Sequence, residues 1–333
     1  MRLKKLASNK SLLISLLLVV VLAAMYFVAG AFRTVFLAIY LLPNVYLYHQ
    51  MKKAFRQGRH RVIFTLIFVG VVLLFPLSMF GDESAHGLSH YARMAGYYYL
   101  PLMLYSFLLY VVFDLLLLIN RVRPFISMQA LISRPKRKVV LVAVLAVSGM
   151  FIAAGIINFN QTRINTYQVE LPARSSHLDE LKIAVAADVH LSNITRKDFV
   201  DQFVNTMNET RADMILLVGD ILESNEHTPR MEFFQESFSR LQATYGVYAV
   251  EGNHEHYGRN SGYDFFSRAD IQLLRDTVIQ MGDAFYLAGR KDRHVRNRLP
   301  VSAIMEQASD ALPLIMMDHQ PYTLEKTAAH DID

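Results

Sequence analysis

The chain has 333 residues, which is enough for two domains at the usual size of about 100 to 200 residues each. It contains no cysteine, which excludes disulfide bonds and thiolate metal sites, so any metal needs histidine, carboxylate or amide ligands. The net charge of +5 does not indicate a nucleic-acid partner, because the basic residues concentrate in short loops between apolar stretches.

Hydrophobic residues make up 53% of the chain, and their excess lies before Asn158. A cleavable signal peptide is one interpretation of the N-terminus, but the apolar run there is long and continues into more apolar sequence. We instead expect an α-helical transmembrane bundle over residues 1–158, with a shorter apolar stretch, Thr34–Tyr48, as a candidate fifth helix. Four stretches are apolar over the roughly 20 residues that a helix needs to cross a bilayer: Ser11–Gly30, Val62–Phe80, Gly96–Ile119 and Val139–Ile157.

Basic residues remain on the cytoplasmic side of a membrane, so their positions predict how the helices cross it. If Ser11–Tyr48 crossed only once, the first two basic clusters would face opposite sides. Five spans place all clusters inside, the acidic loop Gly81–Ala95 outside, and everything after Asn158 on the extracytoplasmic side. The three clusters are Arg2, Lys4 and Lys5; Lys52, Lys53, Arg56, Arg59 and Arg61; and Arg134, Lys136, Arg137 and Lys138.

Asp114 is a carboxylate inside the predicted span Gly96–Ile119. It is a functional candidate, because placing a charge within lipid is costly. An ion pair with a basic residue such as Arg33 or Arg121 is the competing interpretation. One isolated carboxylate is thin support for a transporter, and the sequence leaves the role of Asp114 open.

Residues 159–180 are expected to link the membrane region to a soluble domain over residues 181–333. Short apolar runs alternate there with amphipathic segments, which is typical of an α/β sandwich with a sheet between helical layers. The predicted strands are Lys182–Ala187, Asp213–Val218, Val247–Val250, Phe285–Ala288 and Pro313–Met317. The predicted helices are Arg196–Thr210, Met231–Ala243 and Phe265–Gln280.

Polar groups that can bind a metal follow four of these strands. Each one alone is an ordinary turn residue, but turn chemistry does not explain the ordered series at successive strand ends. Functional sites of open α/β sheets lie at the carboxyl ends of the strands, so we expect these groups at one edge. They are Asp188 and His190, then Asp220, then Asn253, His254 and Glu255, and last Asp318 and His319.

Mixed carboxylate, imidazole and amide oxygen ligands suit two divalent ions such as Mn, Fe or Zn. Two ions about 3.5 to 4 Å apart can share a bridging carboxylate and a bridging hydroxide. Such a pair provides a nucleophile at neutral pH and a clamp for phosphoryl oxygens. The sequence therefore predicts metal-dependent hydrolysis of a phosphoester or pyrophosphate.

Segments Ala187–His190, Val218–Asp220 and Glu251–Glu255 resemble the successive signature motifs of the calcineurin-like metallophosphoesterases. The resemblance covers Leu181–Asp333, and it is specific because the order and context of the motifs match as well as the residues. Within the family, the segment is similar to the membrane-associated bacterial branch, some of whose members hydrolyse UDP-2,3-diacylglucosamine or similar nucleotide-lipid pyrophosphates. The resemblance implies a bacterial cell membrane, two divalent metal ions and a phosphorylated small-molecule or lipid substrate.

The resemblance also implies roles for six residues. Asp220 would bridge both metals. His254 would not be a ligand but would orient the phosphate and help to protonate the leaving oxygen, a role that imidazole suits near neutral pH. The remaining ligands would be Asp188 and His190 for the first metal, and Asn253 and His319 for the second.

The family pattern continues with a Gly-His-x-His element after a further strand, and this element is absent from the sequence as given. Its two histidines would complete one ligand set for each metal, so we expect this α/β sandwich, incomplete at its C-terminus, to bind metal poorly and hydrolyse little. Two interpretations stay open: a piece of a longer enzyme, or a non-catalytic membrane protein with a degenerate domain for binding or assembly. The remaining histidines expected to have no site role are His227, His256, His294 and His330.

Overall fold

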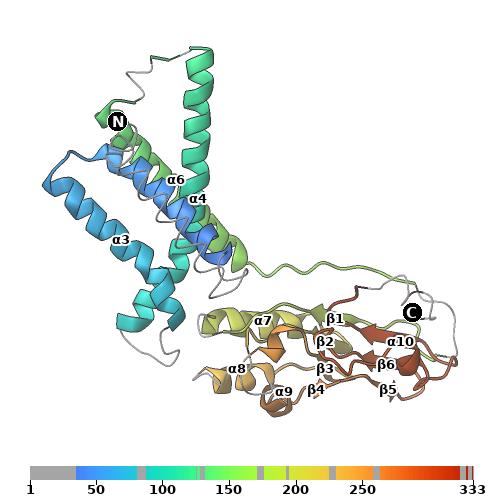
Figure 1. The fold of residues 1–333 in the computed structure, drawn as a ribbon. Helices are drawn as coiled ribbons and strands as arrows, with labels where there is room; N and C mark the ends of the chain where they lie inside the picture. Colours follow the sequence, from blue (N-terminus) through green and yellow to red (C-terminus); the bar gives the residue numbers. More distant parts are fainter. Residues whose placement is uncertain are drawn as a thin grey trace. The chain divides into compact units, whose positions relative to one another are not determined.

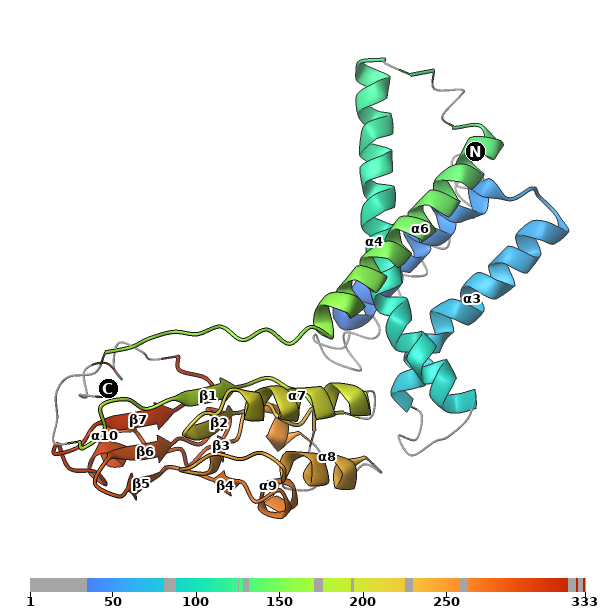
Figure 2. The same ribbon diagram turned by 180° about the vertical axis from the view of Figure 1, so that it is seen from behind.

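The computed structural model divides into two compact units, Met1–Phe159 and Asn160–Asp333, and Figures 1 and 2 show the ribbon from opposite sides. Among the described residues, the strands all belong to the second unit. The predicted span Ser11–Gly30 lies outside the described residues, as do His227 and His330. The described residues are 35–80, 88–124, 126–127, 132–170, 176–192, 195–224, 230–257, 263–322, 328 and 332.

Apolar helices make up the described part of the first unit. Residues 35–51 are helical and are followed by the short 3-10 helix η1 (Lys52–Ala54). Within the described residues, three helices are long and apolar enough to cross a membrane, judged by length and composition alone. They contain three of the predicted spans, which are thus confirmed as helices. These are α3 (Arg59–Phe80), α4 (Leu88–Val122) and α6 (Arg134–Phe159).

One expectation about this unit is wrong, because α4 begins at Leu88 and so includes the second half of the predicted loop Gly81–Ala95. Polar residues mark the place where a chain leaves the bilayer, but they do not have to end the helix. The backbone hydrogen bonds of a helix form between its own residues and continue outside the membrane. Both α3 and α6 pack against α4.

Among the described residues, which do not include Arg33, the hydrogen-bond donors of Asp114 are neutral, and Arg121 is not its partner. Its Oδ2 atom accepts hydrogen bonds from Tyr46 Oη, at 2.8 Å, and from Gln50 Nε2. Arg121 lies seven residues further along α4, which is about two helical turns or 10 Å. The nearest described cation in this network is Lys53, whose Nζ donates to Gln50 Oε1 at 2.7 Å.

The described residues of the second unit form two β-sheets. Strands β1 (Ile183–Ala186), β2 (Met214–Val218), β3 (Val247–Val250) and β4 (Gln272–Leu273) form a parallel sheet in that order. In the other sheet, β6 pairs antiparallel with β5 and parallel with β7. All five predicted strands are confirmed to within two residues. The bounds of the second sheet are β5 (Thr277–Met281), β6 (Phe285–Gly289) and β7 (Leu314–Met317).

The helices of this unit match the sequence in part. The helix predicted over Arg196–Thr210 is confirmed as α7 (Lys197–Glu209), while α8 (Met231–Phe238) is shorter than predicted. The short helix α10 (Val301–Met305) was not predicted.

The predicted helix Phe265–Gln280 is wrong beyond Arg268, where α9 (Tyr263–Arg268) ends. Asp270 has φ 55° and Asp276 has φ 52°, and such left-handed residues interrupt a right-handed helix. The backbone N–H of Leu274 donates to the carbonyl of Ala249 on β3 at 2.8 Å. The segment therefore continues as β4 and β5.

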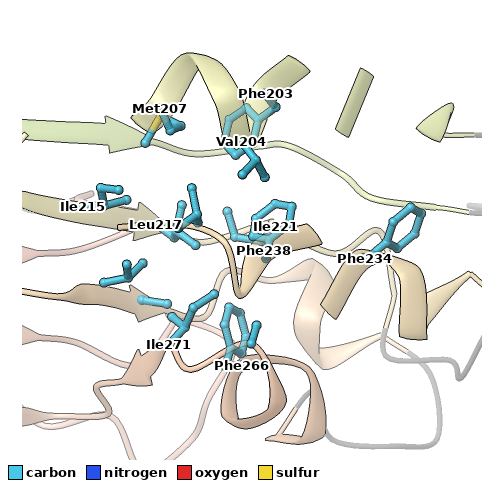
Figure 3. Close-up of a cluster of buried hydrophobic side chains, with 14 of the residues drawn as sticks. Phe203, Val204, Met207, Ile215, Leu217, Ile221, Phe234, Phe238, Phe266 and Ile271 are labelled. Carbon is cyan, nitrogen blue, oxygen red and sulfur yellow. The ribbon is translucent and has the colours of Figure 1, made fainter. Parts of the chain in front are cut away.

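Two apolar layers hold the sheets. On β2, Ile215 and Leu217 face one side and Met214 and Leu216 face the other, since side chains alternate along a strand. Figure 3 shows the first layer, where Phe203, Val204 and Met207 of α7 and Phe238 of α8 pack toward Ile215 and Leu217. The second layer joins the parallel sheet to the other sheet through Tyr248, Val250, Phe285, Leu287 and Met317.

The expected sheet between two helical layers is therefore wrong for one face. Helices α7, α8 and α9 cover one face of the parallel sheet, and the sheet β5-β6-β7 covers the other, as Figures 1 and 2 show. Burial of a strand on both faces requires apolar cover on each side but does not specify whether a helix or a sheet supplies it.

Candidate metal centre

The predicted site residues lie at the carboxyl ends of the strands. Strands β1, β2 and β3 are parallel, so the segments that follow them meet at one edge. The segments after β1 and β2 pair further by backbone hydrogen bonds, from Asp188 N to Gly219 O at 3.0 Å and from His190 N to Asp220 O at 3.0 Å. His319 comes from the other sheet, directly after β7, and its Nδ1 lies 2.8 Å from the carbonyl of Val218 on β2. Both sheets therefore contribute to one site.

Two groups of candidate ligand atoms share Asp220. Asp188, Asp220 and His319 each offer one atom, and these atoms lie within 4.8 Å of one another. His190, Asp220 and His254 form a second group with the same spacing. The Asp220 carboxylate is buried, whereas the Asp188 side chain is 61% exposed. The buried carboxylate of Asp220 therefore belongs to both candidate metal sites.

Two histidines have ring orientations suited to a metal. His319 Nδ1 must donate to Val218, because a carbonyl oxygen can only accept, so Nε2 keeps its lone pair, 3.3 Å from Asp220 Oδ2. His190 Nδ1 lies 2.8 Å from Glu223 Oε2, which leaves His190 Nε2 toward Asp188 and Asp220 at 3.9 Å from each. A histidine that binds metal commonly donates its other ring N–H to a carbonyl or carboxylate in this way.

The pKa of His319 reflects the same surroundings. Burial alone would lower the pKa, because it disfavours the charged ring. The hydrogen bond to Val218 and the nearby carboxylates of Asp220, Asp188 and Asp292 together outweigh burial and raise the pKa of His319 above its ordinary value. The surroundings of His319 are thus negatively charged, which favours the binding of a cation.

The segment after β3 supplies the remaining predicted residues. His254 Nδ1 lies 3.0 Å from the carbonyl of Glu223, and the rings of His254 and His190 are in edge contact with centroids 4.6 Å apart. The Asn253 amide accepts a hydrogen bond from Gln320 Nε2 at 2.5 Å and donates to Tyr257 Oη at 3.3 Å. Asn253 is therefore held between the segments that follow β3 and β7.

Glu255 is fully buried and joins two strand ends. Its Oε2 accepts hydrogen bonds from the backbone N–H groups of Asp220 and Gly252, at 2.9 and 2.8 Å, and its Oε1 accepts one from Leu222 at 2.9 Å. Burial raises the pKa of Glu255, although these three donors oppose the shift. The carboxyl group thus fixes the backbone on which Asp220 stands.

Backbone strain is concentrated at the predicted ligands. Asp188 has φ 57°, His190 has φ 51° and Asp220 has φ 51°, all in the left-handed region that non-glycine residues rarely adopt. Such conformations cost roughly 1 to 3 kcal/mol each and tend to cluster at functional sites. The surrounding hydrogen bonds of Glu255 and of the paired loops hold these residues in place.

Two glycines leave room for the ligands. A Cβ atom on Gly219, which also has φ +79°, would meet the His319 ring at 2.4 Å, and one on Gly252 would meet Asp220 Oδ1 at 2.2 Å. Neither distance is tolerable for carbon against these atoms. The glycines of the Gly-Asp and Gly-Asn-His-Glu segments are therefore steric requirements of the site.

We predict that Gly252→Ala weakens Mn²⁺ binding at least about tenfold, because the new methyl group displaces the Asp220 carboxylate, and even outer contacts of metal ligands matter to that extent. Gly282→Ala is the control: its φ of +57° also strains an alanine, but nothing lies within 4 Å of the added Cβ, so Mn²⁺ affinity should stay at the native value. Isothermal titration calorimetry of the full chain in detergent measures both. Equal Mn²⁺ affinity in Gly252→Ala and native protein would contradict the packing argument.

One residue at the site, Glu223, was not predicted, and two nearby histidines were expected to have no role there. Glu223 contacts both His190 and His254, yet it was not predicted as a site residue, because no periodic pattern marks the position three residues after Asp220. His294 lies in a loop, as expected, and its Nδ1 is 2.8 Å from Asp292 Oδ1. His256 is exposed, as expected of a loop residue.

Comparison with known proteins supports a family assignment for the second unit. Residues 181–330 match the model of the family described as calcineurin-like phosphoesterase. Two Helicobacter pylori proteins named uncharacterized metallophosphoesterase are 29% and 30% identical over 171 residues, which cover 49% of this chain and 45% of each relative. This chain thus covers a little under half the length of these relatives.

Two further relatives extend the similarity toward the apolar helices. An uncharacterized metallophosphoesterase of Campylobacter jejuni is 23% identical over 306 residues, or 88% of this chain and 78% of that protein. A Bos taurus protein named transmembrane protein with metallophosphoesterase domain is 24% identical over 210 residues, or 58% of this chain and 46% of that protein. The matches support a calcineurin-like metallophosphoesterase domain and, with the three apolar helices of the described residues, suggest membrane association.

Proposed function

We propose that the protein is a membrane-anchored hydrolase of phosphoesters or pyrophosphates that uses two divalent metal ions. The observation that carries the proposal is the position of Asp220 between two groups of candidate ligand atoms. The family match supports hydrolase activity in general, and the described helices support the anchor. Lipid-linked and nucleotide-linked phosphates, as in the bacterial branch that the sequence resembles, are the proposed substrate class.

The residues that would hold the ions are Asp188, His190, Asp220, Asn253 and His319. When bound, the ions would lower the pKa of water and neutralise charge on the phosphoryl oxygens. The mixed oxygen and nitrogen ligands suit Mn, Fe or Zn and do not distinguish among these three metals. The chain itself fixes the imidazoles through Glu223 and Val218 and fixes Asp220 through Glu255.

His254 would supply the proton for the leaving oxygen. Because the Glu223 carbonyl can only accept, the proton of neutral His254 lies on Nδ1, and a second proton would be held on Nε2. The imidazolium can donate that Nε2 proton and then return to the neutral form without turning its ring. Its side chain is 25% exposed, so solvent can reprotonate it between turnovers.

The first test separates this role from metal binding, because the His254 ring also lies among candidate ligand atoms. We expect His254→Gln to lower turnover of bis(p-nitrophenyl) phosphate at saturating Mn²⁺ by about 10² to 10⁴ while Mn²⁺ affinity changes little. His190→Gln should lose Mn²⁺ affinity as well as turnover. Calorimetry and a colorimetric assay of the full chain in detergent measure the two quantities.

Loss of Mn²⁺ affinity in His254→Gln to the same extent as in His190→Gln would show that His254 is a ligand and would refute its role as the proton donor. Absence of Mn²⁺-dependent, chelator-sensitive turnover both by this chain and by the chain extended with a Gly-His-x-His element would refute the hydrolase proposal and favour a non-catalytic membrane protein.

The second unit is also proposed to lie on the extracytoplasmic side. If α3, α4 and α6 each cross the membrane, the basic clusters before α3 and at the start of α6 fall on one side, and Asn160 falls on the other. We predict that alkaline phosphatase fused after Asp333 is active and that a green fluorescent protein fused there is dark. Fusions after Lys53 should behave oppositely. Fluorescence at Asp333 without phosphatase activity would reverse the orientation.

A further inference from the structure

A basic loop follows β6 and lies beside the candidate metal centre. Over residues 290–298 it contains five Lys and Arg residues and one Asp. Because β6 is parallel to β7, the loop leaves the sheet at the edge where His319 follows β7. The backbone N–H of Arg290 donates to the carbonyl of Met317 at 3.0 Å, two residues before His319. The loop and the metal centre therefore share one edge of the domain.

Buried ion pairs anchor the two ends of the loop. Asp318 accepts from Arg290 Nη1 at 2.7 Å and from Arg298 Nη2 at 2.6 Å, and all three side chains are largely buried. Asp276 accepts from the backbone N–H groups of Lys291 and Leu299, at 3.0 and 2.9 Å. A loop tied at both ends by buried carboxylates has a defined shape rather than that of a loose surface segment.

The middle of the loop presents cations that no described carboxylate neutralises. Arg293 and Arg296 are exposed, and neither forms an ion pair with another residue of the described ranges. Arg293 lies over the ring of Tyr322, with its guanidinium carbon 4.3 Å from the ring centroid. Tyr322 comes three residues after His319, so this contact holds the Arg293 side chain beside the segment that carries a candidate ligand.

His294, between the two exposed arginines, is held by a buried carboxylate. Asp292 is fully buried, and its Oδ1 is 2.8 Å from both the backbone nitrogen and Nδ1 of His294. Since a carboxylate oxygen accepts, His294 Nδ1 is the donor, and this contact fixes the loop between Arg293 and Arg296. The planar forks of the two arginine side chains match the geometry of phosphate oxygens.

We propose that Arg293 and Arg296 bind a second phosphoryl group of the substrate, next to the one held at the metal centre. This inference rests on the proposed function and narrows its substrate to a molecule with two adjacent anionic phosphoryl groups. The two exposed arginines place positive charge beside the proposed cation site, and an anionic substrate would neutralise that charge.

Two matched ligands test the proposal. Methyl methylphosphonate carries one anionic phosphoryl group, and the symmetrical dimethyl ester of methylenediphosphonate carries two, joined by carbon so that the bridge is not hydrolysed. Calorimetry of the full chain in detergent at saturating Mn²⁺ should show that the diphosphonate binds at least about tenfold more tightly, as one additional ionic contact allows. In the double variant Arg293→Gln/Arg296→Gln this preference should disappear.

Arg240→Gln is the matched control, because Arg240 is an exposed arginine of the same unit that pairs with Asp201 on α7. It should keep the preference at the native value. Failure of the native chain to prefer the diphosphonate, or survival of the preference in the double variant, would overturn the inference. The proposed hydrolase function is judged separately, by turnover of bis(p-nitrophenyl) phosphate, which has one phosphoryl group and does not need the basic loop.

Discussion

Asp220→Asn should reduce Mn²⁺-dependent hydrolysis by at least about a hundredfold. Residues that only support a metal ligand cost 10- to 100-fold when replaced, so a ligand shared by two ions should exceed that range. The substitution keeps the shape of the side chain, and its amide oxygen can still accept the hydrogen bond from the backbone of His254. The loss would therefore come from the missing negative charge and the missing second oxygen between His190 and His319.

The measurement is turnover of bis(p-nitrophenyl) phosphate by the full chain at saturating Mn²⁺, with Mn²⁺ binding followed by calorimetry. Asp198→Asn is the control, because Asp198 is an exposed aspartate whose partner is Arg196 at the start of α7. Both variants should insert into membranes as the native chain does, since the substitutions lie in the second unit. Retention of most turnover in Asp220→Asn would show that Asp220 does not bridge metals.

The fold was predictable where local pattern and tertiary packing agree. Strand Val247–Val250 has the predicted bounds: a short apolar run between Gly246 and Gly252 indicates a strand buried on both faces, and all four residues are buried. The helix predicted over Phe265–Gln280 is wrong because apolar residues recur there at spacings that fit a helix, while Asp270 and Asp276 adopt left-handed φ values. Nothing in their residue type specifies that choice, since aspartate also occupies ordinary turns.

The arrangement of layers was less predictable. The alternation of Ile215 and Leu217 against Met214 and Leu216 shows that both faces of β2 are covered. The second cover comes from β6 and β7, and their membership of a separate sheet depends on contacts between residues far apart in sequence. A local pattern contains no information about such pairing.

The candidate site was also predictable in one part and not in another. Parallel strands force the groups after β1, β2 and β3 to one edge, so the proximity of Asp188, His190 and Asp220 could be expected before the structure. The contacts that hold these residues in place could not be predicted from the sequence. Glu223 lies in a loop, and its position beside His190 depends on the pairing of the loops after β1 and β2.

Glu255 is the support whose loss should have the largest structural effect. Its carboxylate accepts three backbone N–H groups, two from the segment after β2 and one from the segment after β3. Glu255→Ala leaves all three donors without this partner in a buried site, and a buried unsatisfied donor costs roughly 1 to 3 kcal/mol. We expect a loss of about 3 kcal/mol or more in the free energy of unfolding, together with at least about tenfold weaker Mn²⁺ binding.

Glu255→Gln should be milder, because one oxygen can still accept from Asp220 and Gly252 while the amide nitrogen opposes the Leu222 N–H. Glu236→Ala removes a glutamate from the exposed face of α8 and should change stability by about 0.5 kcal/mol or less. Thermal unfolding of the full chain in detergent measures stability, and calorimetry measures Mn²⁺ affinity. We expect both to fall in the order native, Glu255→Gln, Glu255→Ala. If Glu255→Ala unfolds at the native temperature and binds Mn²⁺ with native affinity, the strand ends are held by other contacts, and Asp220 does not depend on Glu255 for its position.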